Sequence, residues 1–293
     1  MSTFKRIMVG LDFSKIDRSV IHYTGVLSKL IKPNKIYFIN VQKSLETSET
    51  LWKDFPDYRV PKDERLSHNM TIEVERNFHD HEKFDIEYIV AEGSPLKELQ
   101  HWIEIKNIDL LVVGQKELIK GSGILPQQLA RAISAAVLFV PQKAHKQIDD
   151  VLVPIDFSEP SKKALITALS MAHDNPNASI FCQHVFYVPK GYYYTEKGKN
   201  DMRFALTNLY KQEYNQFIAP LNMNGTHLSP LLSCGENDEP ALITLNTARN
   251  KSSDIIIIGG AGKTWFDKLL LGSFTEKLLQ INKEIPMLII KNK

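Results

Sequence analysis

A group of glycines and one serine near the end of the chain has the composition of a phosphate-binding loop. The group consists of Gly259, Gly260, Gly262, Gly272 and Ser273, and it directly follows the apolar segment 255–258. Glycine adopts positive φ and places no Cβ between its N–H group and a ligand, so backbone amides can approach phosphate oxygens closely. The composition of this stretch therefore indicates an anion site.

The predicted helix after these glycines adds a second reason to expect an anion. Ser273 and Glu276 have the spacing of a capping box, which predicts that Ser273 is the N-cap of the last helix. Unpaired N–H groups and the positive end of the helix dipole attract negative charge. Each residue alone also fits a structural role, as a turn glycine or a helix cap. Their combination favours anion binding.

Gly262, Lys263 and Thr264 imitate the end of a P-loop, but the rest of that motif is missing. A P-loop needs a glycine five positions before Gly262, and residue 257 is isoleucine. The sequence therefore excludes P-loop chemistry.

The elements that position this stretch come from an internal duplication. Residues 6–14 (RIMVGLDFS) return as 150–158 (DVLVPIDFS), with Asp12 matching Asp156. Further segments pair as 35–41 with 179–185, 87–95 with 228–240, 109–114 with 254–259, and 137–142 with 287–292. The repeat predicts two domains, 1–146 and 147–293, each with five strands.

Segments with helical periodicity alternate with the predicted strands. Residues 15–30 and 162–173 each place apolar side chains on one face, and Ser14 and Ser158 are the predicted N-caps of these helices. Alternating strands and helices form parallel βαβ units. We therefore expect an α/β fold with two tandem, doubly wound, parallel-sheet domains. The longer stretches 44–80 and 189–224 are each expected to hold a helix and a loop.

Composition excludes several classes of protein. The 293 residues carry a net charge of +2 and are 43% hydrophobic, which is ordinary for two soluble domains and too balanced to predict nucleic-acid binding. No apolar run approaches the roughly 18 residues that cross a membrane. The two cysteines offer no disulfide framework, so we expect a reducing, cytoplasmic location.

The spacing Gly259, two residues, Gly262, nine residues, Gly272, Ser273 resembles the ATP-binding signature of the universal stress protein family. The resemblance implies a Rossmann-like sheet of order 3-2-1-4-5, with ATP as ligand and an accompanying Mg²⁺ left open. It also implies that the glycine loop and the Gly-Ser step hold the phosphates and ribose. The implied binding residues are Pro154, Asp156, Val185, Gly259, Gly260, Gly262, Lys263, Gly272, Ser273 and Thr275. In the family, a proline and an aspartate of the first strand and an apolar residue ending the second strand frame the adenine. In this sequence they correspond to Pro154, Asp156 and Val185.

Asp156 has two interpretations that the sequence leaves open. A carboxylate at the end of the first strand can accept hydrogen bonds from ribose hydroxyls or an adenine amino group. It can equally cap the following helix together with Ser158.

The first half departs from the signature. Glu117 replaces the second glycine, Gln127 and Gln128 replace the Gly-Ser pair, and Gly10 replaces Pro154. A carboxylate 4 Å from a phosphate charge costs about 1 kcal/mol in water and more when partly buried. We therefore expect one nucleotide site per chain, in the second half.

The resemblance implies a nucleotide-responsive regulator or protective protein that acts through unknown protein partners. Its halves are expected to pair as an internal pseudo-dimer, with a homodimer left open. The alternatives are a scaffold without ligand and a slow ATPase. No nucleophile beside a base can be identified, no catalytic residue is predicted, and no metal site is predicted. Trp265 can fold over the nucleotide, contact the first half or form a partner surface, and residues 192–194 (YYY) can form a ligand lid or pack on the surface.

Overall fold

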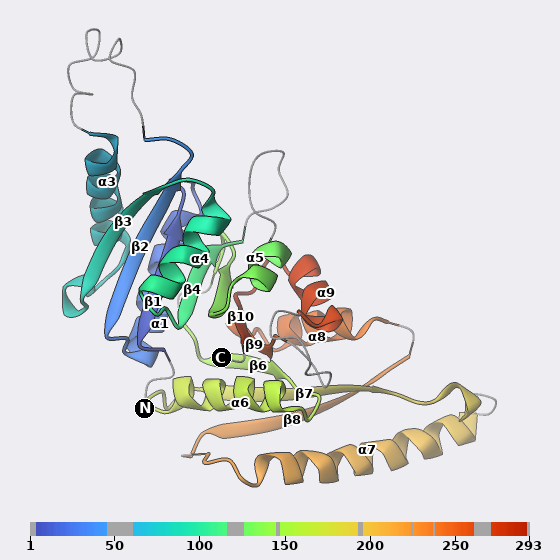
Figure 1. Ribbon diagram of the computed structural model, residues 1–293. Coiled ribbons are helices and arrows are strands. Elements are labelled where there is room, and N and C mark those ends of the chain that lie inside the picture. The colour runs from blue at the N-terminus through green and yellow to red at the C-terminus, as the bar shows by residue number, and fades with distance from the viewer. Residues whose placement is uncertain are drawn as a thin grey trace. The chain divides into compact units, whose positions relative to one another are not determined.

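The computed structural model describes residues 4–45, 61–115, 126–144, 147–192, 196–223, 225–236, 238–260 and 271–291. Contacts between Cα atoms divide the chain into two compact units, Met1–Lys146 and Gln147–Lys293. Each unit contains a parallel sheet covered by helices (Figure 1). The predicted α/β fold class is confirmed.

The first unit has the strand order β3-β2-β1-β4-β5, as expected. Helices α1 and α3 pack together on one face of this sheet, and α4 and α5 pack together on the other (Figure 1). Its elements are β1 (Arg6–Leu11), α1 (Asp17–Ile31), β2 (Lys35–Gln42), α3 (Lys62–Asn77), η2 (His81–Lys83), β3 (Ile86–Glu92), α4 (Pro95–Ile105), β4 (Leu110–Gly114), α5 (Pro126–Ala132) and β5 (Ala136–Val140).

The second unit repeats this topology with the order β8-β7-β6-β9-β10, which is again 3-2-1-4-5 within the unit. Its elements are β6 (Asp150–Pro154), α6 (Glu159–Ala172), β7 (Ser179–Tyr187), η3 (Lys190–Tyr192), α7 (Glu196–Ile218), β8 (His227–Gly235), α8 (Pro240–Asn250), β9 (Ile255–Gly259), α9 (Ser273–Ile281) and β10 (Met287–Ile290).

Runs of branched aliphatic residues form the central strands because both faces of these strands are covered. Every residue of β9 and of β10 is buried, as expected for parallel strands with helices on both sides. The predicted helices in the long connections are also present within the described residues, as α3 and α7.

The duplication extends to individual hydrogen bonds. The Asp109 carboxylate accepts the backbone N–H groups of Lys5 and Arg6, at 3.0 and 3.1 Å. Asp254 accepts those of residues 149–150 at 2.8 and 2.9 Å. In both units a carboxylate at the start of the fourth strand therefore fixes the start of the first.

A second pair of matching bonds lies at the opposite ends of the first strands. The Asn40 side chain donates to the carbonyl of Leu11 at 2.9 Å. At the equivalent place, Nδ1 of His184 lies 2.9 Å from the carbonyl oxygen of Ile155. Because a carbonyl only accepts, Nδ1 of His184 carries the hydrogen.

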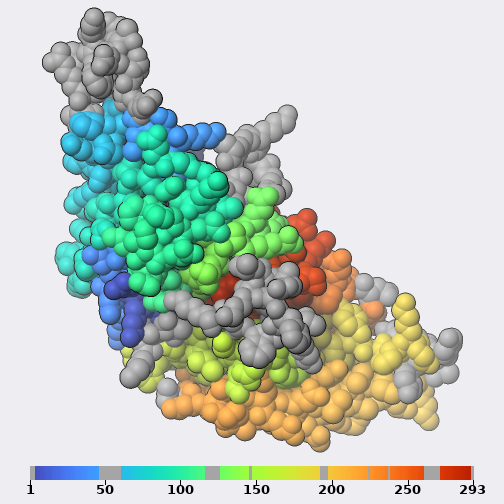
Figure 2. Space-filling view, viewed as in Figure 1, coloured from blue at the N-terminus to red at the C-terminus, as the bar shows by residue number. Residues whose placement is uncertain are grey.

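Helix α7 covers β7 and β8 with its inner side and leaves its outer side open. Tyr210 packs against His184 and Phe186, with ring centroids 4.5 and 5.1 Å apart, and Tyr214 is buried. On the outer side, Phe204 is 70% exposed. The side chains of α7 lie on the surface of the second unit in the space-filling view (Figure 2).

Gly259 is a glycine because the first turn of α6 approaches the end of β9 closely. A Cβ at this position would lie 2.8 Å from the carbonyl carbon of Pro160. Among the described glycines, positive φ occurs at Gly93 and Gly225, so the positive φ expected at Gly259 and Gly260 was wrong. Close packing explains Gly259 instead.

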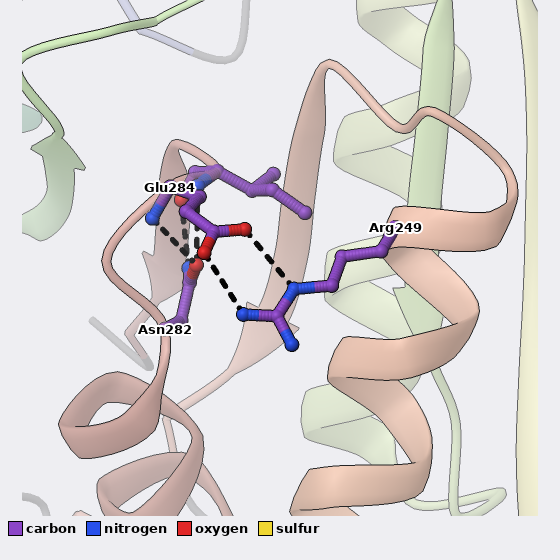
Figure 3. A network of polar contacts seen from close by, with 4 residues as sticks. Arg249, Asn282 and Glu284 are labelled. Atoms are coloured by element: carbon purple, nitrogen blue, oxygen red, sulfur yellow. Dashed lines mark hydrogen bonds and ion pairs between the residues drawn. The ribbon is translucent and has the colours of Figure 1, made fainter.

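Asn282 organises the connection between α9 and β10 (Figure 3). Its buried side chain donates to the Ile285 carbonyl at 2.7 Å and accepts the N–H groups of Glu284 and Ile285 at 3.3 and 3.1 Å. Arg249 of α8 forms two hydrogen bonds with the Glu284 carboxylate, both 3.0 Å long. These contacts link α8 and the end of α9 to the segment that leads into β10.

We expect Gly259→Ala to destabilise the second unit by about 1–3 kcal/mol, because the new methyl group would collide with main-chain atoms of α6. Urea unfolding, with hydrogen exchange of β9 as the local probe, measures this. Gly10→Ala is the control, since the nearest atom to its Cβ would belong to the Val113 side chain, at 3.2 Å, and no main-chain atom would be closer. Equal destabilisation by the two substitutions would contradict this explanation of Gly259.

Asn282→Ala should lower the free energy of unfolding by about 2–4 kcal/mol, because it leaves a buried carbonyl and two N–H groups without their partner. Arg249→Ala should cost less than about 1 kcal/mol, because both side chains of that ion pair are largely exposed. Denaturant midpoints of the two variants test the difference. A larger loss for Arg249→Ala would show that the ion pair, and not the asparagine, organises this connection.

Candidate functional site

The candidate site lies at the carboxyl ends of β6 and β9, which are neighbours in the sheet. Pro154 is the last residue of β6 and Gly259 the last of β9, and both are buried. The contact between Gly259 and Pro160 brings the start of α6 to the same edge. An open α/β sheet binds ligands at such an edge.

The start of α9 differs from the sequence expectation. The N-cap is Gly272, and Ser273 is the first helical residue with no capping hydrogen bond, so the predicted capping box was wrong. The reason is a tertiary contact: Gly272 donates its N–H to the carbonyl of Gly260 at 2.8 Å, and its own carbonyl accepts from Glu276 at 2.9 Å.

This geometry leaves the first turn of α9 available for an anion. Ser273 is exposed, and its hydroxyl has no partner within the described part of the chain. The backbone N–H groups of residues 273–275 likewise have no acceptor among the described residues, because the first N–H accepted in the helix is that of Glu276. A hydroxyl and the backbone donors of one helix turn therefore lie together at the edge of the sheet.

Thr275 has a positioning role in this structure. The side chain is buried, and its hydroxyl donates to the carbonyl of Gly259 at 3.0 Å. This bond ties the first turn of α9 to the end of β9. Ala130, its counterpart in the first unit, has no hydroxyl to make the tie.

Gly260 is also tightly enclosed. Its N–H donates to the Ile290 carbonyl at 2.8 Å, and a Cβ would lie 3.2 Å from that oxygen. The first unit repeats the bond between Gln115 and Val140, also at 2.8 Å. The backbones of the two units are therefore equivalent here, although the side chains differ.

Asp156 takes part in capping α6. Its Oδ1 accepts the N–H of Ser158 at 3.1 Å and also the Ser158 hydroxyl, while Ser158 is the N-cap and accepts from the N–H of Ser161. The predicted cap at Ser158 is confirmed. The second carboxylate oxygen, Oδ2, has no partner in the described part of the chain, and the residue is half-buried. Both interpretations of Asp156 are therefore compatible with its geometry.

The corresponding turn of the first unit is closed by a carboxylate. Oδ2 of Asp17 accepts the N–H groups of Asp12 and Phe13 at 3.1 and 2.6 Å. Helix α1 begins at Asp17, so the predicted N-cap at Ser14 was wrong. The carboxylate of Asp17 satisfies the turn from inside the helix.

Ser161 replaces Asp17 in the second unit, and its hydroxyl donates to a backbone carbonyl of the preceding turn at 2.9 Å. The turn itself is the same, since φ is 58° at Phe13 and 60° at Phe157. No acceptor for the N–H groups of residues 156–157 is found in the described part of the chain. This difference between Asp17 and Ser161 was missed in the sequence, although the repeat alignment contains it.

Val185 lies inside β7 and pairs with Ser233 of β8. The strand continues for two more residues, to Tyr187, so Val185 does not end it as expected. Other predicted positions lie outside the described residues, namely Gly262, Lys263, Trp265, Tyr193 and Tyr194.

Sequence analysis also missed Lys291, which follows β10 at the same edge of the sheet. Its Nζ is buried and has no hydrogen-bond partner among the described residues. Its counterpart in the first unit is Pro141, so the repeats show that the two halves differ here, but they do not show that the lysine is buried.

The described residues contain no group of three or more His, Cys, Asp or Glu side chains arranged to hold a metal ion. Among the described helices, none has the length and apolar character that a membrane crossing requires.

Comparison with known protein families gives a match in the second half of the chain. The family model described as "Universal stress protein family" matches residues 147–291. No curated protein sequence is significantly similar to this chain.

Among solved structures, a universal stress protein from Archaeoglobus fulgidus DSM 4304 is similar over 100% of both chains, with a TM-score of 0.63 and 18% identity. A functionally unknown protein from Pseudomonas aeruginosa PAO1 has a TM-score of 0.65 and 12% identity, over 98% of this chain and 92% of that one. Both support the fold. Residues 147–291 therefore form a domain of the universal stress protein family.

Proposed function

We propose that the second unit binds one ATP molecule at the carboxyl edge of β6 and β9. The observation that carries this proposal is the uncapped start of α9. There an exposed Ser273 hydroxyl and the N–H groups of residues 273–275 have no acceptor in the described part of the chain. Unpaired donors at the positive end of a helix suit a phosphate group.

The phosphate end of the site consists of α9 and the loop before it. Ser273 donates from its side chain, and Gly272 lets the backbone come close to the ligand. Gly259 and Gly260 allow the close packing against α6 and β10 that brings the loop to this edge. Gly262 and Lys263 belong to the same proposed loop through the family signature. Thr275 acts indirectly, because its hydroxyl holds the first turn of α9 against β9.

The sugar and base end of the site lies at β6 and β7. Oδ2 of Asp156 is the acceptor proposed for ribose hydroxyls or the adenine amino group, with Pro154 and Val185 as apolar neighbours. The N–H groups of residues 156–157 add hydrogen-bond donors on the same side. In the first unit, the Asp17 carboxylate accepts the two equivalent N–H groups, those of Asp12 and Phe13.

The first unit supports a single site per chain. Asp17 places a buried carboxylate against the turn after β1, and Glu117 adds a second carboxylate in the loop sequence. Helix α5 begins at Pro126, so Gln127 and Gln128 lie within the helix where the other unit has its Gly-Ser step. Carboxylates near phosphate oxygens oppose binding.

In this proposal the chain is a nucleotide-responsive stress protein that acts through protein partners in the cytoplasm. It binds nucleotide without needing to turn it over, and any Mg²⁺ would be held mainly by phosphate oxygens and water. The pairing of the two halves as a pseudo-dimer remains a prediction.

Native mass spectrometry should find one adenine nucleotide per wild-type chain. Ser273→Ala should weaken ATP binding about tenfold, as expected for one lost hydrogen bond to a charged group. Gln128→Ala, at the matched position of the first unit, should leave the affinity unchanged. Gly262→Glu, which copies Glu117, should abolish binding. Two nucleotides per chain, or none, would contradict the proposal.

Ser161→Asp transfers the closing carboxylate of the first unit into the second. The new side chain should accept the N–H groups of residues 156–157 and lower ATP affinity about tenfold through charge repulsion. Ser161→Asn is the uncharged control and should bind more tightly than Ser161→Asp in calorimetric titrations. Equal affinities would mean that charge at this turn does not govern binding.

A further inference from the structure

Lys291 carries a buried ammonium group that nothing in the described protein neutralises. Its Nζ is buried and makes no hydrogen bond there. Burial lowers the pKa of this side chain below its usual value, because the charged form loses hydration. A buried, unpaired charge is costly, whereas an anion beside it would offset that cost.

The stem of this lysine runs beside Gly260, which directly follows β9. Its Cδ lies 3.4 Å from the position that a Cβ of Gly260 would occupy. The carbonyl of Gly260 accepts the N–H of Gly272, the N-cap of α9, at 2.8 Å. Nζ is two bonds beyond Cδ, or about 2.5 Å. The ammonium group therefore lies within about 6 Å of that Cβ position, and Gly260 is itself hydrogen-bonded to the N-cap of α9.

The first unit lacks this cation on an equivalent backbone. Gln115 and Val140 form the same N–H to carbonyl bond as Gly260 and Ile290. The residue after Val140 is Pro141, and Gln115 places a buried side chain where the second unit has glycine. The lysine thus occurs only in the unit whose glycine signature is intact.

We propose that the ammonium group of Lys291 is the counter-charge of the bound phosphate chain, so that the second unit selects adenine nucleotides over adenosine. This inference rests on the proposed function, and it assigns the charge recognition of that site to a residue outside the glycine signature. Lysine binds phosphate as a compact point charge and needs no single fixed geometry to do so.

Isothermal titration of ATP and of adenosine into the wild type and Lys291→Met tests the assignment. Methionine keeps the length and apolar character of the side chain but removes the charge. ATP affinity should fall about tenfold or more, as for a lost hydrogen bond between charged groups. Adenosine affinity should change less than about twofold. Lys291→Arg, which keeps the charge, should retain most of the preference for ATP.

Lys251→Met is the matched control for a general loss of positive charge. Lys251 lies after α8, next to the start of β9 and so at the opposite end of that strand. This variant should bind ATP like the wild type. A comparable loss of ATP affinity in Lys251→Met would contradict a local role for Lys291.

Thermal unfolding separates binding from folding. Without nucleotide, Lys291→Met should melt at or above the wild-type temperature, because it removes an unpaired buried charge. With ATP its melting temperature should rise less than that of the wild type. A lower melting temperature without nucleotide would overturn the assignment, since it would show a structural partner for the ammonium group.

The titrations also separate the two proposals. Unchanged ATP affinity in Lys291→Met, with tight binding by the wild type, would overturn the role of Lys291 and leave the proposed function standing. Absence of ATP binding by the wild type would overturn both.

Discussion

The close packing of α6 on the end of β9 is the constraint on which the second unit's candidate site depends. Main-chain atoms of Pro160 lie where any side chain at residue 259 would have to begin. This contact brings the turn containing Asp156 and the end of the fourth strand together. Thr275 then fixes the first turn of α9 to the carbonyl of the same glycine. One residue without a side chain therefore joins three elements at the edge where the sheet can bind a ligand.

Much of the fold could be predicted because its determinants are local or repeated. Aliphatic runs such as 255–258 identify buried strands, and the internal repeat identifies two units with matching elements. The strand order came from the family resemblance, since no local pattern encodes it.

The errors arose where distant contacts decide local structure. A capping-box pattern at Ser273 cannot reveal that Gly272 is held by Gly260, twelve positions earlier in the chain. The same limitation applies to Ser14, whose expected role is replaced by the carboxylate of Asp17. Lys291 was missed because a single lysine at the end of a strand has no significance until its burial is known.

The two units place different charges on the same backbone. The first has the Asp17 carboxylate against the turn after its first strand, where the second has Ser161. Where the first has Pro141, the second has the cation of Lys291. The hydrogen bonds that build the sheets are preserved while these side chains differ. Electrostatics, rather than topology, therefore distinguishes the unit proposed to bind a nucleotide.

The matching carboxylates of Asp109 and Asp254 have a consequence for how the chain folds during synthesis. Asp109 reaches back 104 residues to Lys5, and Asp254 reaches back 105 residues to Asp149, so each link closes within its own unit. Long-range closures of this kind slow folding, because chain entropy is lost before the contact forms. All five strands of the first unit nevertheless come from residues before the second unit begins, so the amino-terminal unit can fold while the rest of the chain is still being synthesised.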